Sequence, residues 1–220
     1  MHPLFVSAPP CSPTAGRLLR AVGAGALALL LGACSTPRSA VYDFGPGPTQ
    51  ATAANRMAPL PTVLLAEVDG ASALDGTAML YRLLYADAQQ LRPYAQARWS
   101  MPPAQLLRLR LRELLGQRRS LLGATDAVPP GTLVLRLELE EFSQLFGTAQ
   151  SSSALVRLRA TLGRSGSPAR VLAQTSLVQQ QPSTTADAPG GVKALAQASD
   201  ALALQLDQWL QQVVAAEVTP

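Results

Sequence analysis

Hydrophobic and polar residues alternate along two stretches in the second half of the chain, 133–140 and 156–162, and a third candidate strand follows at 171–178. Successive side chains of a β-strand point to opposite faces of a sheet, so this pattern predicts strands with one face on a core and the other in water. Turn-forming segments at 147–153 and 163–169, rich in Gly and Ser, separate the three stretches. Such close connections favour an antiparallel meander.

The polar face of this predicted meander carries charges of opposite sign. Glu138 and Glu140 lie on its first strand, and Arg157 and Arg159 lie on its second. Strand pairing is expected to bring these charges together on the solvent face, where an opposed pair contributes roughly 0.2–1 kcal/mol. We interpret them as markers of strand register rather than as a catalytic carboxylate pair.

The first half of the domain predicts three more strands, at 62–68, 79–85 and 90–99. Apolar runs bounded by Pro, Gly and Asp indicate the first two, and spaced large residues indicate the third. A helix is expected at 104–119, because the prolines at 102–103 suit the first turn of a helix, where an N–H group would have no partner.

The predicted helix at 104–119 has an ambiguous pattern. Leu and Arg alternate from 107 to 112 as in a strand, whereas the leucines at 107, 111, 114 and 115 form a helical stripe. The length and the proline start favour the helix and leave Leu109 outside its apolar stripe. We expect the arginines on a solvated face, the alternative being contact with anionic headgroups or an acidic partner.

A last helix is predicted after the polar loop 179–191, with Asp187 as its cap. Seven residues are spaced alternately by three and four positions: Val192, Leu195, Ser199, Leu202, Leu206, Trp209 and Val213. This heptad stripe suits either a coiled coil or a helix on the sheet, and the scarcity of flanking charges favours the sheet. The predicted fold is α/β, with a single mixed, largely antiparallel sheet packed with helices.

Residues 1–33 predict a signal peptide. Arg17 and Arg20 precede an uncharged apolar run, 21–31, which is about half the length that a membrane-spanning helix needs. The run ends in Leu31, Gly32, Ala33 and Cys34. These four residues resemble the lipobox of bacterial lipoproteins, so we expect cleavage before Cys34 and its lipidation. The alternative is an ordinary secretory signal followed by an incidental cysteine.

Residues 34–61 predict a flexible tether, because a composition rich in Pro, Ala, Thr and Gly buries too little apolar surface to fold. Within it, the segment 42–44 is expected to dock as a short strand. One folded domain is then expected at 62–217. Ser35 follows the cysteine, and by resemblance to enterobacterial lipoproteins it favours lipid anchoring at the periplasmic face of the outer membrane.

Composition limits the chemistry of the mature chain. The only histidine, His2, lies in the predicted signal peptide, and Cys34 is the only cysteine beyond it. This excludes His-based acid–base catalysis, Cys–His nucleophiles and His-ligated zinc, and it leaves no disulfide. We therefore predict a protein that is not an enzyme and holds no metal or cofactor. Basic and acidic residues are interspersed, which argues against nucleic-acid binding.

A short signature runs through the first half of the domain. It consists of Asp75-Gly76, Met79-Leu80-Tyr81-Arg82, Leu91-Arg92-Pro93-Tyr94, Arg98-Trp99-Ser100-Met101-Pro102-Pro103 and Leu106-Leu107. In order and spacing these segments resemble the ABC-type transport auxiliary lipoproteins, the family that includes paraquat-inducible protein C. The lipobox, the segment 41–45, the meander and the last helix extend the resemblance. One departure is Tyr94-Ala95, where many members carry paired tyrosines.

The resemblance implies a non-catalytic subunit of a lipid-transport system across the cell envelope. The partners that it implies are a periplasmic MCE-domain protein, an ABC permease and its ATPase. It also implies a homo-oligomer, for which the heptad stripe offers a surface. The candidates for partner or lipid contact are Tyr81, Arg82, Tyr94, Arg98, Trp99 and Trp209. The competing interpretation of the aromatic candidates is that they fill the core.

Other functions stay open at the level of sequence. An interaction module for another envelope machine, such as cell-wall synthesis, would share the anchor and the tether. A periplasmic lipid carrier would need a deep apolar cavity inside a curved sheet. A carboxylate enzyme would need two of Glu138, Glu140, Glu141 and Asp126 to converge in a cleft.

Overall fold

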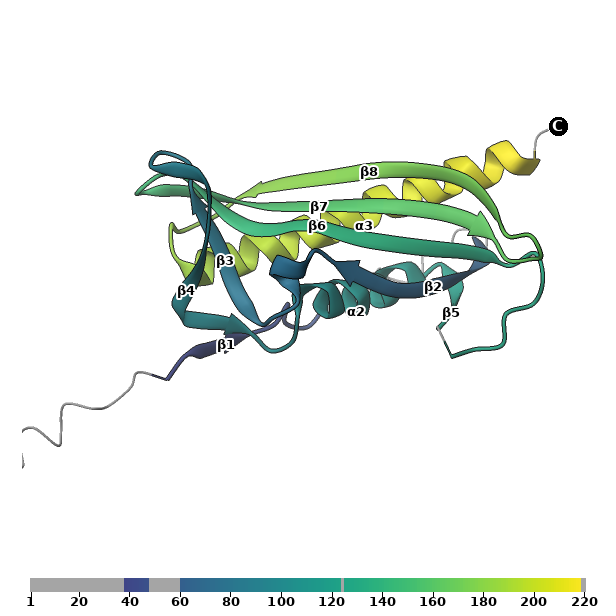
Figure 1. The fold of residues 1–220 in the computed structure, drawn as a ribbon, viewed down its shortest axis with the longest axis horizontal. Helices are drawn as coiled ribbons and strands as arrows, with labels where there is room; N and C mark the ends of the chain where they lie inside the picture. Colours follow the sequence, from purple (N-terminus) through teal and green to yellow (C-terminus); the bar gives the residue numbers. More distant parts are fainter. Residues whose placement is uncertain (1–37, 48–59, 124, 219–220) are drawn as a thin grey trace, which may run out of the picture. The chain divides into compact units, whose positions relative to one another are not determined.

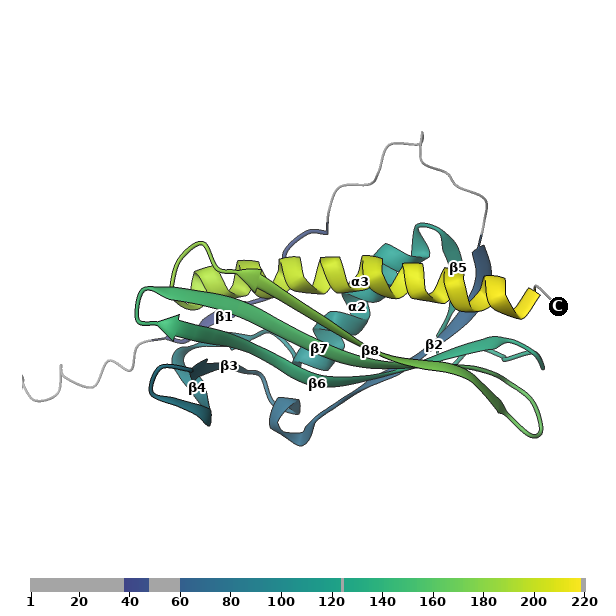
Figure 2. The same ribbon diagram turned by 90° about the horizontal axis from the view of Figure 1, so that it is seen from above.

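The computed structural model describes residues 38–47, 60–123 and 125–218, which contain an eight-stranded sheet and two α-helices (Figures 1 and 2). Both helices lie against the same face of the long strands (Figure 2). The predicted signal peptide, the lipobox and most of the tether lie outside the described residues.

The elements follow the predicted order. They are β1 (Ala40–Tyr42), β2 (Leu60–Gly70), a 3-10 helix (Ser72–Leu74), β3 (Ala78–Leu83), β4 (Asp87–Trp99), α2 (Pro103–Gly116), β5 (Arg119–Leu122), β6 (Leu133–Thr148), β7 (Ser151–Arg164), β8 (Arg170–Pro182) and α3 (Ala188–Val218). The ambiguous stretch is helical, as predicted, and Leu109 is 52% exposed. Strand β5 was not predicted, and β1 lies slightly before the segment 42–44 that was expected to dock.

Two predicted loops are wrong in length. Strands β6 and β7 continue through most of 147–153 and leave only 149–150 between them. Strand β8 continues to residue 182, so the polar loop covers 183–187 rather than 179–191. At both loops the backbone hydrogen bonds between strands continue beyond the apolar side chains, because these bonds join N–H and C=O groups and need no apolar side chains.

Strand β6 is the centre of the sheet. One of its edges pairs antiparallel with β7, which pairs in turn with β8. The other edge is shared by two parallel strands, β2 along the first half of β6 and β3 along the second. Strand β5 extends the sheet from β2, and β4 and then β1 extend it from β3. The sheet is therefore mixed, as predicted, and its longest pairings are the antiparallel ones of the predicted meander.

The charges on the polar face only partly follow the prediction. Arg159 lies opposite Glu138, and its Nη2 is 2.7 Å from the Oε1 atom of Glu140. Arg157, however, lies opposite Glu141, because the register shifts between residues 139 and 141. Arg159 and Glu138 are more than half exposed, so their pair marks the register and adds little stability.

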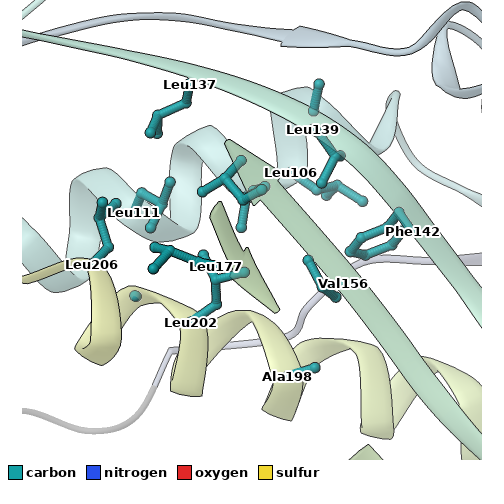
Figure 3. Packing of buried hydrophobic residues seen from close by; sticks show 14 of the residues in the cluster. Leu106, Leu111, Leu137, Leu139, Phe142, Val156, Leu177, Ala198, Leu202 and Leu206 are labelled. Atoms are coloured by element: carbon teal, nitrogen blue, oxygen red, sulfur yellow. The ribbon is translucent and has the colours of Figure 1, made fainter. Parts of the chain in front are cut away.

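The core lies between the long strands and the two helices. Figure 3 shows Leu137 and Leu139 of β6 facing Leu111 of α2 and two leucines of α3, Leu202 and Leu206. All five are 1% exposed or less. Helix α3 therefore packs on the sheet, which is the arrangement that the sequence favoured over a coiled coil. The central residues of its heptad stripe are buried within the same chain. They are therefore not available to form the coiled coil that was the alternative.

Ion pairs join α3 to α2 and β5. The Nε atom of Arg110 donates to the Oδ1 atom of Asp200 at 2.6 Å, and Arg119 pairs with Asp207. Asp207 also accepts from Arg118 at 2.8 Å. The side chains of Arg110 and Arg119 are only 6% and 1% exposed. The prediction of a solvated face is therefore wrong for Arg110, because carboxylates on α3 lie opposite it.

Asp207→Ala is expected to lower the free energy of unfolding by about 3–5 kcal/mol, because the buried Arg119 guanidinium loses its counter-charge. Glu113→Ala is the control. It removes a carboxylate that is 46% exposed, at an expected cost below about 1 kcal/mol. Denaturant-induced unfolding of both variants measures the difference. A loss for Asp207→Ala no larger than that for Glu113→Ala would contradict the expected role of this pair.

Candidate functional site

The signature residues lie on the β3–β4 hairpin. Tyr81 and Arg82 are on β3, whereas Tyr94, Arg98 and Trp99 are on β4. Strand β3 pairs with the second half of β6, so the hairpin is joined directly to the central strand. The fold thus brings the β3 and β4 parts of the signature into one element.

Three aromatic rings gather beside a buried glutamine at the base of the hairpin. The ring of Tyr81 lies 4.7 Å from that of Tyr94 and 5.8 Å from that of Phe146, measured between centroids. The Tyr94 hydroxyl donates to the Oε1 atom of Gln144 at 2.8 Å. Gln144 is fully buried on β6. The cluster therefore joins β3, β4 and β6 through ring contacts and one buried hydrogen bond.

Gln144 extends this connection to the start of α3. Its Nε2 atom donates to the Ser152 hydroxyl at 2.8 Å and to the backbone carbonyl of Asp187 at 3.1 Å. The Oδ1 atom of Asp187 accepts the Gly190 N–H at 2.8 Å, which confirms the predicted cap. Hydrogen bonds from Thr185 and Gly190 lower the pKa of the Asp187 carboxyl. This carboxylate is therefore committed to ordering the start of the helix.

Tyr94 has a raised pKa. Burial is the main cause, and the neighbouring Tyr81 and Asp187 raise the pKa further. A general base must lose its proton near the working pH, and this phenol keeps it. Tyr94 therefore acts as a neutral hydrogen-bond donor within the cluster.

Arg82 connects the hairpin to β6. Its Nη2 atom lies 3.1 Å from the Oε2 atom of Glu141, and its Nη1 atom donates to the carbonyl oxygens of Ala88 and Gln89 at 3.4 and 3.1 Å. Glu141 also accepts the Ser143 hydroxyl at 2.6 Å. Arg82 thus fixes the position of the hairpin, a role that differs from the predicted partner or lipid contact.

The other contact candidates lie apart from this cluster. Trp99 is 1% exposed, and its ring lies 5.9 Å from that of Phe44 and 5.5 Å from that of Phe142. It is a core residue, as the competing interpretation held. Arg98 is exposed on β4, and Trp209 is partly buried on α3. Cys34 and the other lipobox residues lie outside the described part of the chain.

Sequence reasoning missed the polar residues of β6 that hold the hairpin, above all Gln144. The sequence offers one signal, the break in alternation at the adjacent Glu140 and Glu141, and the structure then buries the five residues 142–146. A strand buried on both faces has this pattern. The polar members of such a run need partners, which the hairpin and the start of α3 provide.

The arrangement offers hydrogen bonds, ring contacts and an ion pair, and its one hydroxyl–carboxylate pair, Ser143 with Glu141, has the serine fully buried. Within residues 38–47, 60–123 and 125–218, no three His, Cys, Asp or Glu side chains are grouped so that they could hold a metal ion. Its evident capacity is to hold the hairpin in place and to present a surface.

Residues 42–207 match the family model described as ABC-type transport auxiliary lipoprotein component. No curated protein gives a significant match. Among solved structures, the fold is similar to that of protein XCC0632 from Xanthomonas campestris, of family DUF330. The TM-score is 0.67 at 19% identity, over 82% of this chain and 100% of that chain. An uncharacterized protein has a TM-score of 0.58 at 13% identity, over 80% and 99% of the two chains. At these identities the likeness concerns the fold.

Tyr94→Phe is expected to lower the free energy of unfolding by about 1–3 kcal/mol, because the buried amide oxygen of Gln144 loses its donor. Tyr85→Phe is the matched control. Tyr85 is 54% exposed, so this change should stay within about 0.5 kcal/mol. Denaturant-induced unfolding measures both variants, and equally small effects would argue against a structural role for the Tyr94 hydroxyl.

The raised pKa of Tyr94 predicts a dependence of stability on alkaline pH. In the unfolded chain the phenol loses its proton above the ordinary pKa of 10.0, whereas the folded chain retains it. The stabilisation is therefore complete below pH 10.0 and is lost as the pH rises toward the pKa of the folded state. Between pH 10.0 and the pKa of the folded state, the free energy of unfolding should fall more steeply for the natural chain than for Tyr94→Phe. Parallel slopes would contradict the raised pKa.

Proposed function

Because the chain belongs to the family of ABC-type transport auxiliary lipoprotein components, we propose that it is the non-catalytic subunit of an MCE-type lipid-transport system in the cell envelope. The family match carries this proposal, since residues 42–207 extend from the end of β1 to most of α3. The proposed partners are a periplasmic MCE-domain protein, an ABC permease and its ATPase. The chain would bind and position these partners without catalysing a reaction.

The proposed attachment to the outer membrane is through Cys34. Each buried methylene of an acyl chain contributes about 0.8 kcal/mol, and two or more chains anchor a protein durably. In the part of the chain that the structure describes, no helix is both long and apolar enough to cross a bilayer.

Arg98 is the candidate that we propose for direct contact with the transport partner. It is exposed on β4, whereas Trp99 is buried and Arg82 is bound to Glu141. The backbone beneath Arg98 is well held, because its neighbours on the two sides are Val41 of β1 and Ala78 of β3. A guanidinium on such a well-held strand suits a carboxylate of a partner protein.

The packing favours an interaction subunit over a lipid carrier. A carrier needs an enclosed apolar cavity, yet the space between the long strands and the helices is filled by buried leucines (Figure 3). Four clefts, with volumes of about 380–610 Å³, lie at the surface around β2, β5, the β7–β8 turn and the end of α3. An interaction module for cell-wall synthesis would share the anchor, but the family match favours transport.

A crosslinking pull-down from membranes tests the proposal. The tagged full-length chain is expected to bring down an MCE-domain protein together with its permease, and Cys34→Ala should lose membrane association. Arg98→Glu should reduce recovery of the partner, because it reverses the charge at the proposed contact. Arg136→Glu, at another exposed arginine on a strand, is the matched control and should leave recovery unchanged.

Two results would contradict parts of this proposal. Recovery of cell-wall enzymes alone, or of no stable partner, would overturn the transport assignment. Equal recovery with Arg98→Glu and Arg136→Glu would remove Arg98 from the contact.

A further inference from the structure

The turn between β3 and β4 exposes two adjacent large apolar side chains. Leu84 is 44% exposed and Tyr85 is 54% exposed, whereas most large hydrophobic residues of the described chain are buried. Single exposed apolar residues are common on protein surfaces. An adjacent pair at the tip of a hairpin can be buried against another surface without any change in the fold of the domain.

This turn is held firmly in place. The Ala86 N–H donates to the Leu83 carbonyl at 3.0 Å, and the Leu84 N–H donates to the Phe146 carbonyl of β6 at 2.9 Å. The Oδ1 atom of Asp87 accepts two backbone N–H groups of the following residues at 3.0 and 3.3 Å. Arg82 adds the connection to Glu141 described above. The exposed pair is therefore presented by an ordered element that could bind a surface at a small cost in conformational entropy.

The turn and the start of β1 lie on the same side of the domain. Strand β1 runs parallel to β4 and pairs with its last three residues, so the start of β1 is level with Ala97, ten residues after β4 begins at Asp87. The β3–β4 turn, the β6–β7 turn and the start of β1 all lie on the left in Figures 1 and 2. The β6–β7 turn consists of Ala149 and Gln150, which are uncharged. The first charge after the exposed pair is Asp87, whose carboxylate already accepts the two backbone N–H groups named above.

The length of chain between Cys34 and β1 limits how far this end can be from an anchoring membrane. Ala40, the first residue of β1, lies six positions after Cys34, and an extended chain spans at most about 22 Å over that length. If Cys34 is lipidated, the start of β1 stays within this distance of the bilayer surface. The β3–β4 turn lies on the same side of the domain as the start of β1 in both views (Figures 1 and 2), so a bilayer on that side can reach both.

We propose that the Leu84–Tyr85 turn is a second membrane contact, which inserts into the interfacial region of the bilayer that holds the lipidated Cys34. The contact orients the domain relative to the membrane. It rests on the proposed lipidation of Cys34. Leucine suits the acyl boundary, and tyrosine suits the interface, where its ring is buried and its hydroxyl stays hydrated. Because Arg82 is neutralised by Glu141, the contact needs no anionic lipid.

Fluorescence quenching in vesicles tests this contact. The full-length lipidated chain carrying Tyr85→Trp is reconstituted into phosphatidylcholine vesicles with brominated acyl chains, and bromine quenches only the tryptophans that it approaches closely. Most of the emission added by Tyr85→Trp should be lost relative to unbrominated vesicles, with a shift to shorter wavelength. Leu204→Trp, at a position on α3 that is 64% exposed, is the matched control and should keep its added emission. The natural tryptophans give the same background in both variants.

The outcomes separate the contact from the anchor. Chains that float with the vesicles while the added emission of Tyr85→Trp stays unquenched would overturn the membrane contact and leave the anchor in place. Chains that do not float would overturn the lipid anchor and the contact together. Quenching of Tyr85→Trp that requires added anionic lipid would overturn the proposed uncharged, interfacial mode of contact.

Discussion

One edge of β6 pairs with two different strands, and the arrangement of the rest of the domain depends on this shared pairing. Backbone N–H and C=O groups in the interior need partners along the whole strand. Strand β2 supplies them along the first half and β3 along the second, with the 3-10 helix between the two. Because the chain reaches β3 there, the β3–β4 hairpin is fixed beside the second half of β6. The signature residues lie in this hairpin.

The two halves of β6 consequently have different surroundings. The first half is buried on one face only, and its other face carries the solvated charges that pair with β7. In the second half five successive residues, 142–146, are buried, among them the polar Ser143 and Gln144. Unpaired polar groups in the interior are costly, so Glu141, Tyr94 and the start of α3 provide their partners. The same hydrogen bonds position the hairpin, so folding and presentation of the surface depend on the same contacts.

Sequence patterns predicted the helices and strands better than they predicted which of these elements lie side by side. Period-two alternation identified β6 and β7, and apolar stripes identified both helices, because these patterns directly reflect a single apolar face; β8 was predicted from the turn before it and its apolar residues. The strand β5 was missed, since its four residues begin with Arg119, whose burial depends on Asp207 far along the chain. For the same reason Arg110 was expected in solvent. Long-range pairing of this kind, like the parallel pairing of β2 and β3 with β6, leaves no local pattern in the sequence.

The candidate site was predicted in part. The signature located the hairpin, and the structure brings Tyr81 and Tyr94 together there, but it places Trp99 in the core and assigns Arg82 to an internal ion pair. The interpretation as an anchored auxiliary subunit depends most on Cys34. The most direct test is the intact mass of the protein extracted from membranes. We predict a chain that begins at Cys34 and carries the added mass of its acyl groups. A chain that begins at another residue, or one with an unmodified Cys34, would contradict the lipid anchor.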